Sequence, residues 1–115
     1  MGKSQPLDAG VHVCCGTDLI KNIWAQMHAI ITRTSETAEI VQPEQRITPM
    51  EAIRLFTINA DYALFEEKTR GSIEPGKLAD LIIIPDNPLT MQVEKIKDIK
   101  PEMVIRGGRV AYQKR

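Results

Sequence analysis

The sequence lacks the features that would direct a protein to a membrane or to the cell exterior. No apolar run approaches the roughly 20 residues needed to cross a bilayer. Residues 1–20 also lack the apolar stretch of a secretory signal. The 15 basic and 15 acidic residues give a formal net charge of zero, so nothing favours binding to nucleic acid or to an anionic membrane. We therefore expect a cytoplasmic protein with neither kind of partner.

Cysteine is nearly absent, and its two copies, Cys14 and Cys15, are adjacent. Neighbouring side chains on an extended strand point to opposite faces, so a disulfide between them would be strained. We expect two buried thiols. At 115 residues the chain has the length of one domain and is long enough to bury a core.

A Pro-Gly turn followed by an apolar run is the most informative stretch of the chain. Pro75 and Gly76 have the φ preferences of the two central positions of a type II turn, which predicts a chain reversal over residues 74–77. We expect residues 72–73 and 78–84 to pair as a hairpin around it. Residues 81–84 read Leu-Ile-Ile-Ile with no polar alternation, which is typical of a strand covered on both faces.

A second hairpin is predicted near the C-terminus. Residues 103–105 and 110–112 are apolar and flank the pair Gly107 and Gly108, and a Gly-Gly pair suits a two-residue hairpin turn. The last part of the chain should therefore form a small antiparallel sheet.

Helical patterns precede the sheet. Residues 11–14 are a short strand candidate that leads to Gly16-Thr17-Asp18, and an apolar stripe with helical spacing then predicts a helix over residues 19–33. The stripe consists of Ile20, Ile23, Trp24, Met27, Ile30 and Ile31. Residues 34–46 are polar and aperiodic, which predicts a connecting loop.

A second helix should begin after Thr48. Thr48 is a capping residue, Pro49 suits the first helical position, and Glu51 completes a capping box. The poor helix formers at 57–59 predict a bend in its continuation. We expect it to bury Ile53, Phe56, Ala60, Ala63 and Leu64.

The order and spacing of these motifs resemble the C-terminal part of the metal-dependent amidohydrolases. The resemblance rests on Gly16-Thr17-Asp18, on the segments 48–59, 65–67 and 71–84, and on Val104-Ile105-Arg106-Gly107-Gly108-Arg109-Val110. The motifs at 65–67 and 104–110 are similar to those of the YtcJ-like, amidohydrolase 3 branch. The family fold is a (β/α)8 barrel with a composite β-sandwich, and a whole barrel needs about 250 residues. The resemblance thus implies an α/β fragment: residues 1–70 as the last strand and helices of the barrel, and residues 71–115 as an antiparallel segment of the sandwich.

Asp18 is the candidate site residue. The resemblance implies that an Asp at this position ends the last barrel strand, binds a divalent metal and acts as the general base that activates water. A carboxylate suits that chemistry because it accepts a proton from water whose pKa the metal has lowered. Without the resemblance, the more common role of such an Asp is to cap the helix expected to begin near Leu19.

The other metal ligands of the family lie on strands that have no counterpart in this sequence. A zinc site needs at least three protein ligands. We therefore expect a divalent metal, with zinc favoured, in the full-length enzyme and none bound to this chain alone. His12 and Cys14 share a strand face and could imitate a ligand set with Asp18, although packed side chains are the more common role of such residues.

Three hypotheses of function remain open at this stage. The first is the C-terminal part of a hydrolase that acts on amide or other non-peptide carbon–nitrogen bonds of a small molecule and is inactive alone. The second is a non-catalytic β-sandwich and helical module for assembly. The third is a small metal-binding protein using His12, Cys14 and Asp18. The strand at 81–84 and the stripe at 20–31 would be left uncovered, so the partner should be a second copy or the missing N-terminal part of the enzyme.

Overall fold

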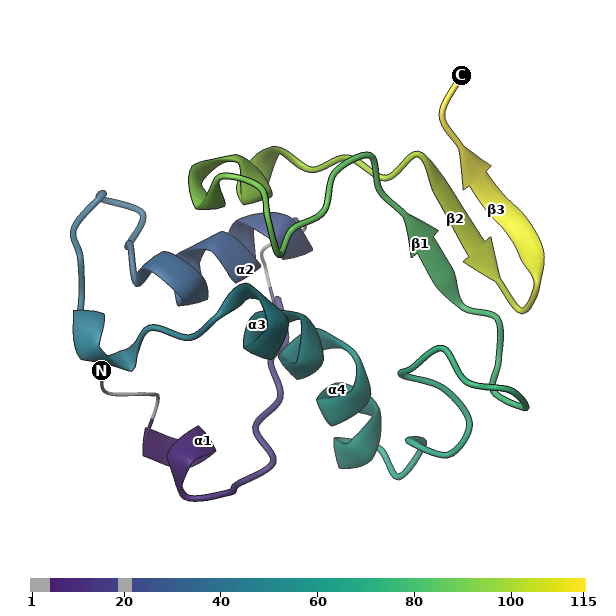
Figure 1. Ribbon diagram of the computed structural model, residues 1–115, viewed down its shortest axis with the longest axis horizontal. Coiled ribbons are helices and arrows are strands. Elements are labelled where there is room, and N and C mark those ends of the chain that lie inside the picture. Colours follow the sequence, from purple (N-terminus) through teal and green to yellow (C-terminus); the bar gives the residue numbers. More distant parts are fainter. Residues whose placement is uncertain (1–4, 19–21) are drawn as a thin grey trace.

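The computed structural model describes residues 5–18 and 22–115. The helices are α1 (Gln5–Asp8), α2 (Ile23–Thr32), α3 (Pro49–Phe56) and α4 (Ile58–Ala63), with the 3-10 turns η1 (Pro43–Gln45) and η2 (Val93–Asp98). The strands are β1 (Leu81–Ile83), β2 (Met103–Arg106) and β3 (Arg109–Gln113). The helices lie in one half of the molecule and the sheet in the other (Figure 1).

Helix α2 is the expected first helix, but its described part begins at Ile23. The side chain of Asn22 caps it, because Asn22 Oδ1 accepts from the amides of Trp24 at 3.0 Å and Ala25 at 3.3 Å. Arg33 closes it with a left-handed φ of 59°. The expected positions 19–21 lie outside the described residues.

The apolar stripe of α2 is covered in part within the chain. Met27 and Ile31 are buried, and η2 packs against the helix (Figure 1). Val93 and Ile96 of η2 and Ile99, the residue that follows it, recur every third residue, which places them on one side of a 3-10 turn. Ile23, Trp24 and Ile30 of the same stripe are half-buried, so an external partner for this face stays a prediction.

The capping box predicted at the second helix is confirmed. Thr48 Oγ1 accepts from the Glu51 amide at 3.2 Å, and Glu51 Oε2 accepts from the Thr48 amide at 2.8 Å. The predicted bend is a break at Thr57, where φ is −122° and ψ is −103°. It separates α3 from α4.

The face that α3 buries differs from the predicted one. Ala52 and Leu55 are buried, whereas Ile53 and Phe56 are only half-buried. On α4 and just beyond it, Ala63 and Leu64 are exposed rather than buried. Which residues of α3 are buried depends on the side of the helix that packs against α2. The local sequence does not specify that side.

Replacing Thr48 with alanine is expected to lower the free energy of unfolding by about 1 kcal/mol, because the first-turn amide of Glu51 loses its acceptor. Urea denaturation followed by circular dichroism measures the change. Thr48→Ser keeps the hydroxyl and should stay within a few tenths of a kcal/mol of the parent. An unchanged midpoint for Thr48→Ala would show that the cap does not stabilise α3.

The sheet is three-stranded and antiparallel in the order β1-β2-β3. The turns at both predicted positions are confirmed: Lys77 N donates to Glu74 O at 3.2 Å, and Gly107 and Gly108 join β2 to β3 with φ values of 54° and 78°.

The predicted hairpin between residues 72–73 and 78–84 is wrong. Strand β1 pairs with β2 instead, with Ile82 opposite Val104. Leu78 N bonds to Thr69 O, so the chain before β1 folds toward the segment after α4. Tertiary pairing with a distant strand replaces the local hairpin.

The core lies between the helices and η2, away from the sheet. The buried apolar residues of the described chain are Met27, Ile31, Ile47, Ala52, Leu55, Ile96 and Ile99. The sheet strands supply none of them, and Ile82 and Ile83 are 54% and 45% exposed. The prediction that residues 81–84 form a strand covered on both faces is therefore not met within the described residues of a single chain.

Candidate functional site

Residues 11–18 lead to the candidate carboxylate, and they form an extended segment rather than the predicted strand. Burial alternates along it: Val13, Cys15 and Thr17 are half-buried, whereas the intervening side chains are exposed. This is the period of a half-buried strand. No neighbouring strand in the described chain pairs with it, so it has the side-chain pattern of a strand without the hydrogen-bond ladder.

Helices α3 and α4 hold this segment in place. Cys15 N donates to Leu55 O at 3.2 Å, and Asn59 Nδ2 donates to Val13 O at 2.9 Å. The ring of His12 stacks on Tyr62 of α4 with centroids 4.1 Å apart and planes inclined by 17°. His12 therefore has an aromatic partner on the protein surface.

Asp18 ends the segment on its exposed side, with a left-handed φ of 45°. Asn22, and not Asp18, caps the described helix α2, and the position near Leu19 where a helix was expected to begin lies outside the described residues. Asp has a short polar side chain that tolerates this backbone conformation better than most residues do. The carboxylate is thus presented outward from the body formed by α2, α3 and α4.

The residues described here do not make up a metal site. Within residues 5–18 and 22–115, no three His, Cys, Asp or Glu side chains are grouped closely enough to hold a metal ion. His12, Cys14 and Asp18 therefore do not form the ligand set considered as a third hypothesis. Zinc takes at least three protein ligands, so the described residues do not hold a zinc ion by themselves.

The two cysteines are free and differ in exposure. Cys14 is exposed, which corrects the prediction that both are buried, and Cys15 is half-buried. Burial raises the pKa of the Cys15 thiol, and the neighbouring Cys14 adds to the shift. A raised pKa keeps Cys15 as the protonated thiol near neutral pH, which is the unreactive form.

The Pro-Gly turn carries a polar cluster that the sequence pattern did not reveal. Lys77 Nζ donates to Ser72 Oγ at 2.6 Å and pairs with Glu74 Oε2 at 2.8 Å, and Ser72 bonds to Glu74. The Lys77 side chain is only 12% exposed. The hydrogen bond from Lys77, followed by that from Ser72, lowers the pKa of Glu74. These three side chains therefore bond to one another across the turn.

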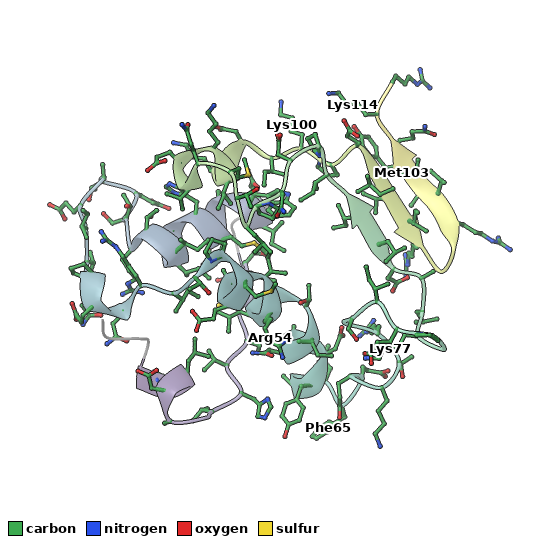
Figure 2. The ribbon with its side chains drawn as sticks, in the orientation of Figure 1. Arg54, Phe65, Lys77, Lys100, Met103 and Lys114 are labelled. Atoms are coloured by element: carbon green, nitrogen blue, oxygen red, sulfur yellow. The ribbon has the colours of Figure 1, made fainter. Side chains whose placement is uncertain are left out.

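Shallow grooves occur elsewhere on the described surface, and Asp18 is not among the residues that line the following ones. One of about 410 Å³ lies between α2, the loop that follows it and η2, and includes His28, Arg46 and Glu94. A second of about 380 Å³ has Met91 and Ile99 among its lining residues, together with the lysines Lys95, Lys100 and Lys114. Figure 2 shows Lys100 and Lys114 near one another at the end of the sheet. The third, of about 260 Å³, adjoins Met103.

No helix among the described residues is long and apolar enough to cross a membrane.

Comparison with known proteins gives a consistent picture. A model described as the amidohydrolase family matches residues 5–112. An N-substituted formamide deformylase of Arthrobacter pascens is 28% identical over 114 residues, covering 94% of this chain and 20% of the deformylase. An imidazolonepropionase of Treponema denticola is 52% identical over 78 residues, covering 61% of this chain and 19% of that protein. A probable imidazolonepropionase of Nematostella vectensis is 31% identical over 112 residues, covering 95% and 24%.

Among solved structures, an amidohydrolase from Thermotoga maritima MSB8 is similar with a TM-score of 0.63 and 21% identity. The similarity covers 94% of this chain and 24% of that one, and it shows the fold alone. The chain spans about a fifth of the length of the curated relatives it matches.

Proposed function

Since this chain belongs to the amidohydrolase family, we propose that the full-length protein hydrolyses a carbon–nitrogen bond, other than a peptide bond, in a small molecule. The observation that carries the proposal is the family match along almost the whole chain, with Asp18 at the exposed end of a half-buried extended segment. We assign residues 1–70 to the end of the barrel and residues 71–115 to the sandwich.

Asp18 is the residue we assign to the chemistry. Its carboxylate would accept a proton from the hydrolytic water, and general-base catalysis of this kind contributes about 10²- to 10⁴-fold to a rate. The segment that ends in Asp18 is tied to Leu55 and Asn59 by hydrogen bonds. These contacts make α3 and α4 the supports that position the base.

The names of the relatives indicate a general substrate class. The names of two relatives specify an N-substituted formamide and an imidazolone propionate. We propose a small molecule with an amide-like carbon–nitrogen bond for this protein as well. The family also suggests a divalent metal in the full-length enzyme, zinc being our choice, with its remaining ligands supplied by residues outside this chain.

The chain alone is expected to show no hydrolysis of an N-substituted formamide or of an imidazolone propionate above the buffer rate. Among residues 5–18 and 22–115, no three His, Cys, Asp or Glu side chains are grouped to hold a metal ion, and zinc needs at least three protein ligands. Release of formate or of the ring-opened acid gives the rate. Turnover that follows the purified chain and disappears in Asp18→Ala would contradict this expectation.

A chimera tests the role of Asp18 directly. The matching segment of the Arthrobacter deformylase is replaced by this chain, and formate release is measured for the parent chimera, Asp18→Asn and the matched control Asp8→Asn. Asp8 is an exposed carboxylate on α1. We expect Asp18→Asn to lose about 10²-fold or more and Asp8→Asn to keep the parent rate.

Two outcomes of the chimera experiment count against the proposal. Equal activity of the parent and Asp18→Asn would remove Asp18 from the chemistry. A folded chimera, of native size and circular dichroism, that has no activity would favour the alternative of a non-catalytic assembly module.

A further inference from the structure

The groove beside η2 is formed by three parts of the chain. Its volume is about 410 Å³, and its lining residues belong to the second half of α2, to the loop that follows α2 and to η2. The loop is folded onto itself, because Thr34 and Ile40 form a β-bridge and Val41 N donates to Arg33 O at 2.8 Å. Pockets that bind small organic molecules have volumes of about 300 to 1,000 Å³. The groove is therefore preformed and large enough for a small ligand.

Apolar side chains from all three parts line this groove. Ile31 of α2 is buried, Val93 of η2 is half-buried, and Ile40 of the loop is 58% exposed. Ile40 is a large apolar residue within a loop that is otherwise mostly polar. Covering such a side chain with a ligand removes its apolar surface from water. A ligand with an aliphatic part is therefore favoured over a fully polar one.

The Arg46 side chain is held beside the groove by a bond that uses only one of its nitrogens. Arg46 Nε donates to Thr32 O, in the last turn of α2, at 3.1 Å. The guanidinium forms no ion pair with a carboxylate of the described chain. Its two Nη groups can therefore bind a ligand carboxylate as a pair, which is the favoured geometry for arginine. Because the side chain is already held, binding costs less conformational entropy.

Glu94 and His28 add polar groups of a different kind to the same groove. Glu94 lies on η2 and, like Arg46, has no ion-pair partner among residues 5–18 and 22–115. His28 is half-buried on α2, and a neutral imidazole donates one N–H. The groove thus offers a carboxylate that accepts from an ammonium group, and an arginine and a histidine that donate to a carboxylate.

We propose that this groove binds a free α-amino acid with an aliphatic side chain. The ligand carboxylate binds Arg46 with His28 as a second donor, and the ligand ammonium group binds Glu94. The aliphatic side chain packs against Ile31 and Ile40. A zwitterion fits because it offers each of the two opposite protein charges a partner, whereas a simple anion or cation leaves one of them unpaired. The proposal does not depend on the hydrolysis assigned above, since the catalytic candidate is not among the residues that line this groove.

Binding is tested by NMR titration of the 115-residue chain with L-leucine. Leucine has few non-hydrogen atoms and the groove is shallow, so we expect a dissociation constant on the order of 0.1 to 1 mM. Isocaproate lacks the ammonium group of leucine, and isoamylamine lacks the carboxylate. Each should bind about tenfold or more weakly than leucine, because it loses one charge-assisted hydrogen-bonded contact.

Substitutions assign each charge of the ligand to its partner. Arg46→Gln should weaken leucine binding about tenfold or more and leave the binding of isoamylamine unchanged. Glu94→Gln should weaken leucine binding to a similar extent and leave the binding of isocaproate unchanged. Arg33→Gln is the matched control: Arg33 Nε also donates to a backbone carbonyl at 3.1 Å, that of Val41, but Arg33 is not among the residues that line the groove. This control should bind leucine as the parent chain does.

The outcomes of the titrations separate the proposal from its alternatives. Leucine binding that is weakened in Arg46→Gln and in Glu94→Gln, and retained in Arg33→Gln, supports the amino-acid site. Equal affinities for leucine and isocaproate would mean a site for anions that does not use Glu94. Equal losses in the two arginine variants would mean that binding depends on the shape of the loop and not on a contact with Arg46. Either of these results, or no binding of leucine up to about 10 mM, overturns the proposal.

Discussion

Replacing Ile96 with alanine is expected to lower the free energy of unfolding by about 2 to 5 kcal/mol. Ile96 is 1% exposed and is the largest fully buried side chain of the described residues. It joins η2 to α2, in the core shared with Met27 and Ile31. The substitution removes apolar contacts and leaves a cavity that the surrounding helices fill only in part.

Urea denaturation with Ile73→Ala as the control measures this effect. The control makes the same chemical change at an isoleucine that is 87% exposed, so it should alter stability by less than about 0.5 kcal/mol. Total stabilities of small domains are about 5 to 15 kcal/mol, so Ile96→Ala could remove a large part of the whole. Equal effects of the two substitutions would mean that η2 is not part of the folded core.

Gly71→Ala is the second substitution with a large expected effect. Gly71 has a φ of 92°, and an added Cβ would lie 2.7 Å from Asp61 Oδ2 and 3.0 Å from Ile58 Cα. The neighbouring Arg70 donates to Asp61 Oδ1 at 2.8 Å, so a shift of Asp61 would also disturb that ion pair. Strain and the close approach together should cost about 2 to 4 kcal/mol.

The control for Gly71 separates the clash from the backbone strain. Gly76 has a similar φ of 89°, but nothing lies within 4 Å of an added Cβ. Gly76→Ala should therefore cost about 1 kcal/mol from the left-handed conformation alone. The difference between the two variants in the free energy of unfolding, measured by thermal or urea unfolding, gives the cost of the close contact with α4. Similar losses for both variants would show that the structure accommodates the added Cβ at residue 71 without a further cost.

Several elements were predictable because their signals are local. The capping box at Thr48, the turn at Pro75 and Gly76 and the hairpin at Gly107 and Gly108 each depend on residues within four positions. The family was also predictable, since its motifs occur in a fixed order along the chain and the family match confirms it. The division at residue 70, the role of Asp18 and the metal stay predictions.

The candidate site was the least predictable part. Residues 11–18 have the period of a strand, yet a strand needs a neighbour, and the described chain supplies helices α3 and α4 instead. The core residue Ile96 was missed because a 3-10 turn of six residues has too short a pattern to stand out. The groove between α2 and η2 was missed for the same reason.

The sequence by itself determined where α3 and the two predicted turns begin, that residues 81–84 and 103–105 are apolar, and that the chain belongs to the amidohydrolases. These properties depend on side-chain chemistry and on contacts between near neighbours. Only the tertiary structure decided that β1 pairs with β2 rather than with residues 72–73, that α2 is covered by η2, and that Asp18 does not cap the described helix. Each of these three outcomes depends on which parts of the chain, distant in sequence, come into contact. The local sequence patterns are compatible with more than one such contact.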